Sequence, residues 1–189
     1  MAIDNYKKVD LSNYSVGQYN PQKGILIRGL WYIINFIIFK SYFLPFYGFK
    51  RFVLRFFGAK VGKGVVIKPG VNIKYAWLLS IGNYTWIGEK SWIDNLVQVN
   101  IGSNVCISQG AMLLTGNHNY KKVTFDLIPG QITLEDGVWI GAKSIVCPNV
   151  ICKSHSVLSV SSVAVENLDE YSIYQGNPAI KVRERIIED

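Results

Sequence analysis

The chain has 189 residues, of which 49% are hydrophobic and 17% charged, and this composition excludes a disordered, solvated tail. A chain of this length buries about two-thirds of its unfolded surface, so we expect one compact domain with a terminal appendage. Twenty Lys and Arg against 13 Asp and Glu give a net charge of +7. That charge suits a polyanionic partner without choosing among a phosphorylated cofactor, nucleic acid and an acidic membrane.

The cysteines and the N-terminal residues bear on the cellular compartment. Cys106, Cys147 and Cys152 are an odd number and have no CxxC spacing, so a disulfide framework is not expected and a reducing cytosol is favoured. The opening residues, MAIDNYKKVDLSNYSVGQYN, are polar and lack the apolar segment of a signal peptide. We therefore predict a cytoplasmic location.

Residues 1–57 are predicted to form a polar arm followed by an apolar helical cap. Residues 1–24 are rich in Asn, Tyr and Lys, and residues 25–57 are crowded with Ile, Phe and Leu. The longest uncharged run in this second segment is shorter than the roughly 20 residues that cross a bilayer. Two helices, interrupted near Pro45 and Gly48, are expected instead.

Two interpretations of this cap are open. In the first, it is a hydrophobic layer packed on the following domain or on a partner subunit. In the second, residues 25–57 lie on an acidic membrane at its inner face. Lys50, Arg51 and Arg55 would then point toward lipid headgroups, and the aromatic side chains would insert.

A six-residue repeat dominates the chain from Val61 onward. Aliphatic residues recur at this spacing, at positions 61, 67, 73, 81, 87, 93, 101, 107, 113, 134, 140, 146, 152 and 158, where the only exception is Cys152. Each repeat predicts one short strand and a tight corner, and three repeats close one triangular coil. We therefore predict an all-β solenoid, a parallel β-helix of about five coils over residues 58–170, with the aliphatic side chains inside.

The interruptions of the repeat are equally regular. The steps from Ile73 to Ile81 and from Ile93 to Ile101 have eight residues instead of six, and they lie 20 residues apart. They are therefore expected at the same edge of the prism. The longer gap between Leu113 and Leu134 predicts an extruded loop near 119–133, and loops of this length in a solenoid are usually functional.

The repeats resemble those of the hexapeptide-repeat acyltransferases, which have a left-handed parallel β-helix. The segments FYGFKRFVLRFFGAKVG, TGNHNY, TFD, VWIGA and GNPA further resemble the colanic-acid-type polysaccharide O-acetyltransferases and, more distantly, the galactoside and maltose acetyltransferases. This resemblance implies a left-handed coil, a homotrimer with sites between subunits, and acetyl-coenzyme A as co-substrate with no metal. It also implies O-acetylation of a sugar or glycan acceptor in exopolysaccharide or capsule assembly. A short tail or helix is expected over 171–189.

The two histidines of the chain occupy different kinds of place. His118 lies in TGNHNY at the mouth of the predicted loop, and His155 lies at a predicted polar corner. Transfer of acetyl from a thioester to a hydroxyl needs a base, and imidazole titrates near pH 6.5. The family's catalytic histidine falls at His118, which implies that His118 is the general base of a direct transfer. His155 is expected to be structural.

Five further residues are candidates for the acceptor site. Coil counting puts Asp94 and Asn95 near the edge that carries His118, where they would bind acceptor hydroxyls or orient the imidazole; a solvated corner is the alternative. Asn117 is a candidate donor to the oxyanion or a turn former. Tyr120 and Asp126 belong to the loop and are expected to close over the acceptor, Asp126 in the TFD segment of the family.

The donor site is implied by the resemblance. Family members lay the pantetheine arm along a groove between β-helices, and the matching positions here are Gly141, Ala142, Ser159 and Val160. Lys181 and Arg183, after GNPA, are candidates for binding the phosphates of the coenzyme. The alternative is that Lys181 and Arg183 form a solvated face of a C-terminal helix.

Other functions are less well supported by the residues. The zinc carbonic anhydrases built on this fold need three histidines, and the chain has two. No nucleic-acid partner is expected, because the positive charge is divided between the cap and the C-terminus and no aromatic array for base stacking is evident. N-acetylation of an amino sugar and a non-catalytic assembly role remain as alternatives.

Overall fold

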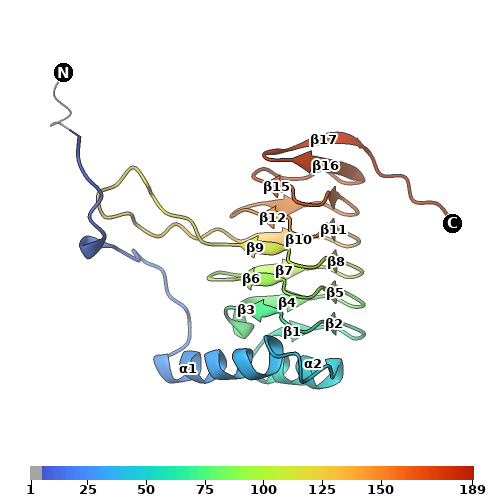
Figure 1. Cartoon of the computed structure of the whole chain (residues 1–189), viewed down its shortest axis with the longest axis horizontal. Coiled ribbons are helices and arrows are strands. Elements are labelled where there is room, and N and C mark those ends of the chain that lie inside the picture. Colours follow the sequence, from blue (N-terminus) through green and yellow to red (C-terminus); the bar gives the residue numbers. More distant parts are fainter. Residues whose placement is uncertain (1–5) are drawn as a thin grey trace.

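The computed structural model describes residues 6–189, so the first five residues of the predicted arm lie outside the described residues. The arm contains a short 3-10 turn, η1 (Leu11–Asn13), and leads into three helical segments: α1 (Ile25–Ile34), the π-helical η2 (Asn35–Phe39) and α2 (Tyr47–Phe56). These segments, residues 25–56, form a flat helix layer across one end of a β-helix (Figure 1). The predicted interruption near Pro45 is confirmed.

The remainder of the chain winds through three sheets whose strands are all parallel except β17 (Figure 1). Sheet A contains β1 (Lys60–Val61), β4 (Leu79–Ile81), β7 (Val99–Ile101), β10 (Ile132–Leu134) and β13 (Ile151–Cys152). Sheet B contains β2 (Val66–Ile67), β5 (Trp86–Ile87), β8 (Cys106–Ile107), β11 (Trp139–Ile140), β14 (Val157–Leu158), β16 (Ser172–Gly176) and β17 (Ala179–Glu184). Sheet C contains β3 (Asn72–Ile73), β6 (Trp92–Asp94), β9 (Met112–Leu114), β12 (Ile145–Val146) and β15 (Val163–Ala164), and the short η3 (Ala76–Leu78) precedes β4. The predicted parallel β-helix is thus confirmed, with five complete coils and part of a sixth.

The aliphatic residue of each repeat points into the prism. Ile67, Ile87, Ile107, Ile140 and Leu158 are stacked in sheet B by the register of its parallel strands, and all are fully buried. Sheets A and C contribute similar buried columns, so the interior is one continuous apolar core. Each such side chain contributes roughly 1.5–3 kcal/mol when it is fully removed from water.

The corners between sheets A and B explain the place of His155. Each of these corners has a residue with positive φ, and the stacked positions are Gly64, Tyr84, Asn104, Gly137, His155 and Tyr171. Glycine, Asn and His are the residues that most readily adopt this backbone conformation. The ring of His155 stacks on that of Tyr171 with centroids 4.7 Å apart, directly above Gly137, where a Cβ would collide with the imidazole. His155 therefore has the structural role that the sequence predicts.

The three interruptions of the repeat all lie at the edge between sheets C and A. The segments between β3 and β4 and between β6 and β7 turn there, and the residues between β9 and β10 extend far out of the same edge (Figure 1). The prediction that the eight-residue steps share one edge is therefore confirmed.

The helix layer closes the first coil by hydrogen bonds to its free backbone groups. Strands β1, β2 and β3 are edge strands, and carbonyl groups on their outer side would be buried without partners. Lys50 is fully buried and its Nζ donates to the carbonyls of Ile67 and Lys68, at 3.2 and 3.3 Å. Arg51 donates to the carbonyl of Val65 at 2.7 Å.

The same pattern continues along the layer. Arg55 donates to the carbonyl of Val61 at 2.7 Å, and Trp31 Nε1 donates to that of Ile73 at 3.0 Å. Asn35 binds the Ile73 amide and the Asn72 side chain. The membrane interpretation of the cap expected Lys50, Arg51 and Arg55 to face lipid headgroups. That orientation is wrong, because all three donate to carbonyls of the first coil, and Arg55 does so while it remains exposed.

The C-terminal residues form a hairpin, which corrects the predicted helix over 171–189. β16 pairs in parallel with β14 and extends sheet B, and β17 returns antiparallel to it. The reason is the unpaired edge that β14 leaves at the last coil, which a strand satisfies and a helix does not. Ile180 and Val182 alternate with Lys181 and Arg183 along β17, which is the period of a strand.

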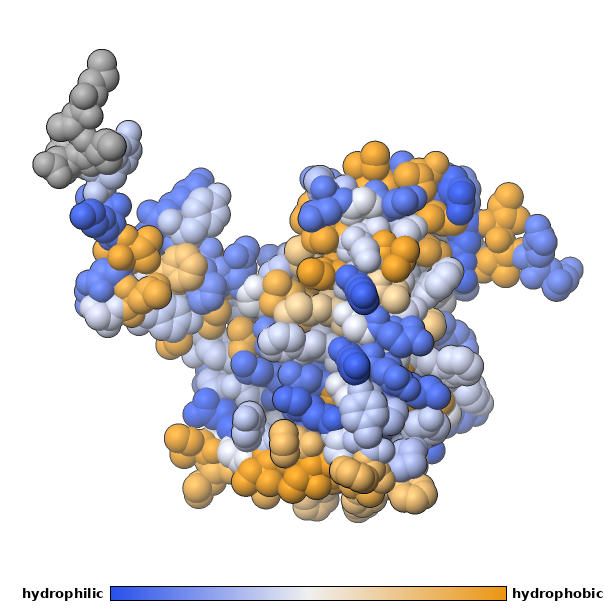
Figure 2. All heavy atoms as spheres, in the orientation of Figure 1, coloured by the Kyte–Doolittle hydropathy of each residue, from blue (hydrophilic) through white to orange (hydrophobic). Residues whose placement is uncertain are grey.

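The described helices are all short. No helix within residues 6–189 has both the length and the apolar character needed to cross a bilayer. A layer of exposed hydrophobic side chains nevertheless covers the outer side of the helix layer, at the base of the molecule in Figure 2.

Candidate active site

His118 lies on an extended arm that projects from the prism edge between sheets C and A. The two sides of this arm pair through their backbones: the Asn117 amide donates to the Ile128 carbonyl at 3.1 Å, and the Ile128 amide donates back at 2.7 Å. Farther out, the Asn119 amide donates to the Asp126 carbonyl at 2.8 Å. The predicted loop is therefore a hairpin-like arm (residues 115–131) with a defined backbone.

The imidazole of His118 is fixed from two sides. Its Nδ1 lies 3.2 Å from the carbonyl oxygen of Phe125, and its ring stacks on the Phe125 ring with centroids 4.5 Å apart. A carbonyl oxygen only accepts hydrogen bonds, so the neutral ring carries its proton on Nδ1 and leaves Nε2 as the free base. Phe125 has a φ of +48°, which costs backbone energy in a residue of this kind.

The N-terminal arm runs along the same hairpin. The Asp10 amide donates to the Val123 carbonyl at 2.9 Å, and the Leu127 amide donates to the Ser15 carbonyl at 2.9 Å. The Tyr14 ring lies at 5.7 Å from the His118 ring, between centroids. Residues 10–15 thus brace the arm that carries His118, a contact that connects positions more than 100 apart in the sequence.

The other predicted residues of the arm have distinct environments. Asn117 Oδ1 accepts from the His118 amide at 2.8 Å, which is the turn-forming role, while its Nδ2 remains available as a donor. Tyr120 is exposed. Asp126 accepts from Lys122 and Thr124, and the bond from Lys122 holds the pKa of its carboxyl below the ordinary value. Asp126 therefore shapes the arm.

Asp94 lies next to the base of the arm in a polar cluster. A Cβ on Gly116 would stand 3.8 Å from Asp94 Oδ2, and Lys74 Nζ is 3.8 Å from Oδ1. Burial raises the pKa of the Asp94 carboxyl, and the Lys74 charge lowers it in part. Tyr19 lies close by, and burial raises the pKa of its hydroxyl, as do the neighbouring Tyr75 and Asp94.

Three polar atoms of this cluster are buried without a hydrogen-bond partner. They are Tyr19 Oη, Arg28 Nε and Asp94 Oδ1. Each unpaired buried polar atom costs about 1–3 kcal/mol. Their convergence beside the arm is typical of a site that a polar ligand completes. Sequence reasoning missed Tyr19 and Arg28; a lone Arg in an apolar helix was the available signal for Arg28.

The structure does not place Asn95 in this site. Its side chain is fully buried, its Oδ1 accepts from the Tyr75 amide, and its Nδ2 donates to the carbonyls of Tyr75 and Leu78. Both polar atoms of this side chain therefore hydrogen-bond to the eight-residue step between Ile73 and Ile81 in the preceding coil. Asn95 is therefore a structural residue, which corrects the sequence-based assignment.

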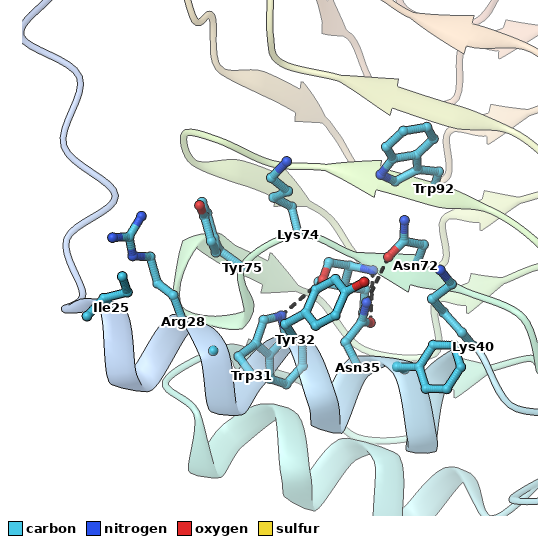
Figure 3. A pocket seen from close by; sticks show the side chains of 13 residues that line it. Ile25, Arg28, Trp31, Tyr32, Asn35, Lys40, Asn72, Lys74, Tyr75 and Trp92 are labelled. Carbon is cyan, nitrogen blue, oxygen red and sulfur yellow. Dashed lines mark hydrogen bonds between the residues drawn. The ribbon is translucent and has the colours of Figure 1, made fainter. Parts of the chain in front are cut away.

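A cavity of about 420 Å³ adjoins the cluster, between the helix layer and sheet C (Figure 3). Tyr32, Tyr75 and Trp92 contribute aromatic walls, and three cations line the cavity, namely Arg28, Lys40 and Lys74. Flat aromatic walls with a few polar groups are typical of small-molecule sites.

A second cavity, of about 550 Å³, lies at the edge between sheets B and C. It brings together five of the six predicted donor residues: Gly141, Ala142, Ser159, Val160 and Arg183. Ser108, Gln109, Trp139 and Arg185 also line it. Trp139 donates from Nε1 to Ser108 Oγ at 2.9 Å, which fixes the indole at the wall of this groove.

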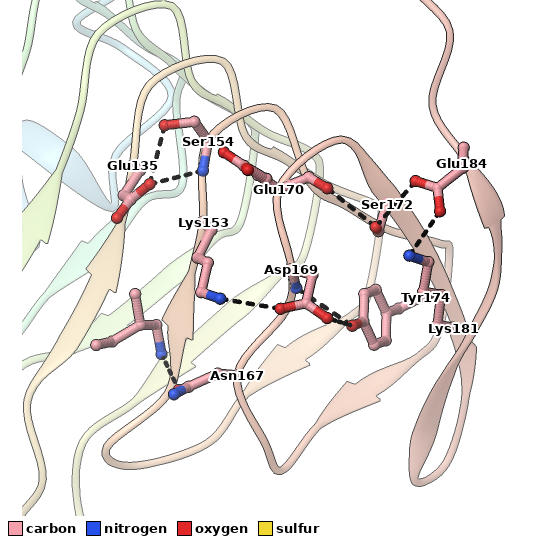
Figure 4. A network of polar contacts seen from close by, with 11 residues as sticks. Glu135, Lys153, Ser154, Asn167, Asp169, Glu170, Ser172, Tyr174, Lys181 and Glu184 are labelled. Atoms are coloured by element: carbon pink, nitrogen blue, oxygen red, sulfur yellow. Dashed lines mark hydrogen bonds and ion pairs between the residues drawn. The ribbon is translucent and has the colours of Figure 1, made fainter.

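Lys181 is absent from the residues that line the groove. Its Nζ is paired with Glu184 at 2.7 Å, within a polar network of the last coils (Figure 4). Glu184 also accepts from the Ser172 hydroxyl. In β17, Arg183 pairs with Ile173 and Lys181 with Tyr174, and Val182 has no partner in this register. This bulge turns Lys181 and Arg183 to opposite sides of the strand, so Arg183 lines the groove and Lys181 does not. Among the described residues, no group of three or more His, Cys, Asp or Glu side chains is placed to share a metal ion.

The two halves of the site lie at different edges of one chain. The arm with His118 leaves the edge between sheets C and A, after β9. The groove lies where the chain leaves β8, β11 and β14, at the edge between sheets B and C. Sheet C separates the two places within one chain.

Known proteins resemble this chain over nearly its whole length. WcaF of Escherichia coli K12, a protein named for acetyl transfer in colanic acid biosynthesis, is 33% identical over 178 residues, which cover 94% of this chain and 97% of WcaF. The galactoside O-acetyltransferase of Escherichia coli K12 is 26% identical over 129 residues, 67% of this chain and 64% of that enzyme. No model of a known protein family matches the chain.

Solved structures share the fold. A hexapeptide-repeat acetyltransferase of Vibrio cholerae, VCA0836, solved with acetyl-coenzyme A, superposes with a TM-score of 0.76 at 21% identity, covering 86% of this chain and 88% of that one. With its coils, its arm and nearly full-length identity of 33% to WcaF, this chain belongs to the colanic-acid-type acetyltransferases of the left-handed β-helix fold.

Proposed function

We propose that this acetyltransferase moves an acetyl group from acetyl-coenzyme A to a hydroxyl of a sugar or glycan in polysaccharide assembly. The observation that carries the proposal is the held imidazole of His118, whose Nδ1 faces a backbone carbonyl and whose Nε2 is free. The names of its relatives support the rest: WcaF is named for colanic acid biosynthesis, and the VCA0836 structure was solved with acetyl-coenzyme A.

The chemistry follows from that geometry. Nε2 of His118 takes the proton of the acceptor hydroxyl while the hydroxyl oxygen attacks the thioester carbonyl carbon. The tetrahedral intermediate then collapses, the carbon–sulfur bond breaks, and the imidazolium returns the proton to the coenzyme thiolate. A positioned base of this kind contributes about 10²–10⁴-fold to the rate. Asn117 Nδ2, left free by the turn, is our candidate donor to the oxyanion.

The acceptor is proposed to bind at the cluster of Tyr19, Arg28 and Asp94. Hydroxyl groups of a sugar both donate and accept, so they satisfy the unpaired phenol, guanidinium and carboxylate atoms together. The aromatic walls of the adjoining cavity suit the apolar faces of a sugar ring.

The donor is proposed to lie in the groove of Gly141, Ala142, Ser159 and Val160. Arg183 and Arg185 stand at that groove, and cations bind the phosphates of a coenzyme well. Arg185 already donates to the carbonyls of Gly137 and His155, so Arg183 is the better candidate.

A homotrimer is proposed to assemble the complete site. The arm and the groove occupy different edges, and a cyclic arrangement lets the His118 arm of one copy reach the groove of the next. Trp86 and Trp139 stand exposed on the outer side of sheet B beside the groove, which suits burial by a neighbouring copy.

Free-thiol release from acetyl-coenzyme A tests the proposal. Wild type and His118→Ala are assayed with sugars, nucleotide sugars and amino sugars, and His155→Asn is the matched control because His155 is the other histidine. We expect acceptor-dependent release that falls at least 100-fold in His118→Ala and is retained in His155→Asn.

Each other outcome has a definite meaning. Release that survives in His118→Ala takes the base role away from His118. Release only with amino sugars changes the reaction to N-acetylation. No release with any acceptor, together with no binding of coenzyme A, favours a non-catalytic assembly role.

A further inference from the structure

The helix layer has two unlike faces. Its inner face carries the polar side chains that close the first coil, including Lys50, Arg51 and Asn35. Its outer face exposes large apolar side chains, forming the hydrophobic band at the base of Figure 2. The exposed residues on this layer are Ile25, Leu26, Ile27, Leu30, Tyr32, Ile33, Phe36, Ile37, Tyr42, Phe43, Phe46, Phe49, Phe52 and Phe56.

The exposure of these residues is extensive. Phe43 is 92% exposed, Leu26 85% and Phe56 74%, and these three come from the connection, α1 and α2 respectively. An apolar surface that spans three segments is larger than the scattered hydrophobic residues of an ordinary surface, and such patches mark interaction sites. The helices lie across the end of the prism (Figure 1), and the hydrophobic side chains gather along that end (Figure 2).

The charge of the chain is concentrated around this face. Residues 11–88, which include the helix layer and the first coils, hold ten Lys and Arg and no Asp or Glu. The rest of the chain holds the other ten cations and all 13 carboxylates. The end of the molecule with the apolar face is therefore strongly positive, and the remainder is slightly negative.

These cations are available to an outside partner. Lys23, Lys40, Lys60 and Lys63 are exposed, and none of the ion pairs within residues 6–189 involves them. Lys60 and Lys63 belong to the first coil, at the rim of the layer. An apolar plane ringed by unpaired lysines complements an anionic lipid surface, with acyl chains below the headgroups.

We propose that the outer face of the helix layer docks on an anionic bilayer, with its apolar side chains in the interface and the lysines at the level of the headgroups. A second copy of the chain is the other conceivable occupant. Two such faces would bring the exposed lysines of both copies, Lys23, Lys40, Lys60 and Lys63, close together, and residues 11–88 hold no carboxylate to offset their repulsion, which disfavours the pairing.

Docking in this orientation has a consequence for the site, which rests on the proposed function. The cavity with Arg28, Lys40 and Lys74 is lined on one side by Ile25, Tyr32 and Phe36 of the same layer. Its mouth would then lie close to the headgroups, so an acceptor attached to a lipid through a phosphate would reach it without leaving the membrane.

Vesicle flotation of the full chain tests the docking. Vesicles of phosphatidylcholine with phosphatidylglycerol are compared with vesicles of phosphatidylcholine alone. We expect binding to the anionic vesicles that weakens with added salt. Leu26→Ser/Phe43→Ser/Phe56→Ser should lower the partition coefficient more than tenfold. The matched control, Ile180→Ser/Ile186→Ser/Ile187→Ser, removes three exposed apolar side chains outside the helix layer and should leave binding unchanged.

A second pair of variants tests the contribution of the lysine charges to vesicle binding. Lys60→Gln/Lys63→Gln should lower binding by roughly fivefold for each lysine, while Lys121→Gln/Lys143→Gln, distant from the layer, should not. Circular dichroism checks that each variant is folded, independently of any acetyl transfer. Wild type that fails to float, or triple variants that behave alike, would overturn the proposal. A change of oligomeric mass in Leu26→Ser/Phe43→Ser/Phe56→Ser without lipid would assign the face to contacts between copies.

Discussion

The imidazole of His118 and the ring of Phe125 stack with centroids 4.5 Å apart and an angle of 11° between their planes, while the Phe125 carbonyl lies 3.2 Å from His118 Nδ1. One residue therefore sets both the plane and the tautomer of the proposed base. His155 and Tyr171 form a second stacked pair, with centroids 4.7 Å apart, at a corner of the prism. The two pairs share their geometry and differ in their proposed role.

Phe125→Gly should lower kcat by roughly 10- to 100-fold, because the imidazole loses the ring that orients it. Stability should change little, since Phe125 has a φ of +48° and glycine adopts that conformation without strain. Tyr171→Gly, at a φ of +47°, is the control and should retain kcat. Steady-state kinetics and thermal unfolding measure both effects. Equal losses of kcat in the two variants would argue against a specific role for the Phe125 ring.

Asp94→Asn should raise the KM for the acceptor and stabilise the protein at neutral pH. Burial raises the pKa of this carboxyl in the folded state, so the folded chain binds its proton more tightly than the unfolded chain. Wild-type stability from this group therefore falls as pH rises from about 4 through the raised pKa. The Asp94→Asn variant has no titrating carboxyl at this position, so it does not lose this stability as pH rises. Urea unfolding across this range measures it, and a less stable Asp94→Asn variant at pH 7 would contradict the expectation.

Val160→Trp should raise the KM for acetyl-coenzyme A more than tenfold, which corresponds to about 1.4 kcal/mol of lost donor binding. Val160 is 64% exposed and lines the groove, so a large ring there fills the groove without disturbing the core. Val165→Trp, at an exposed valine that does not line the groove, is the matched control. An unchanged KM in Val160→Trp would place the donor elsewhere.

Lys50→Met should change how stability responds to alkaline pH. Burial lowers the pKa of Lys50 to about 8 from 10.5, so the unfolded chain binds more protons between these values. Wild-type stability from this group therefore rises between about pH 8 and 10.5, by about 3 kcal/mol at most. Lys50→Met lacks this gain, so wild type should become progressively more stable than the variant as pH rises. A constant difference, measured by urea unfolding, would refute the buried ammonium.

The six-residue spacing of the aliphatic residues was enough to predict the β-helix. Each strand and corner needs one inward side chain every six residues, and this requirement is local in the sequence. The eight-residue steps likewise predicted their shared edge. The C-terminal hairpin was not predictable in this way. By sequence alone, residues 171–189 resemble a charged tail. They form strands because β14 leaves an unpaired edge, and that edge exists only in the folded solenoid.

The residues of the candidate site also fall into two groups, those identified from the sequence and those whose roles only the structure showed. His118, Asp94 and the groove residues Gly141, Ala142, Ser159 and Val160 were identified from sequence, through repeat spacing and the family motifs. Only the tertiary structure showed that the Asn95 side chain hydrogen-bonds to backbone groups and is not free for a ligand. It also showed that the cations of α2 bind carbonyls of the first coil, namely Lys50, Arg51 and Arg55. A residue type states which bonds a side chain can make. Which partner it meets depends on segments far away in the chain, and those are brought together only by folding.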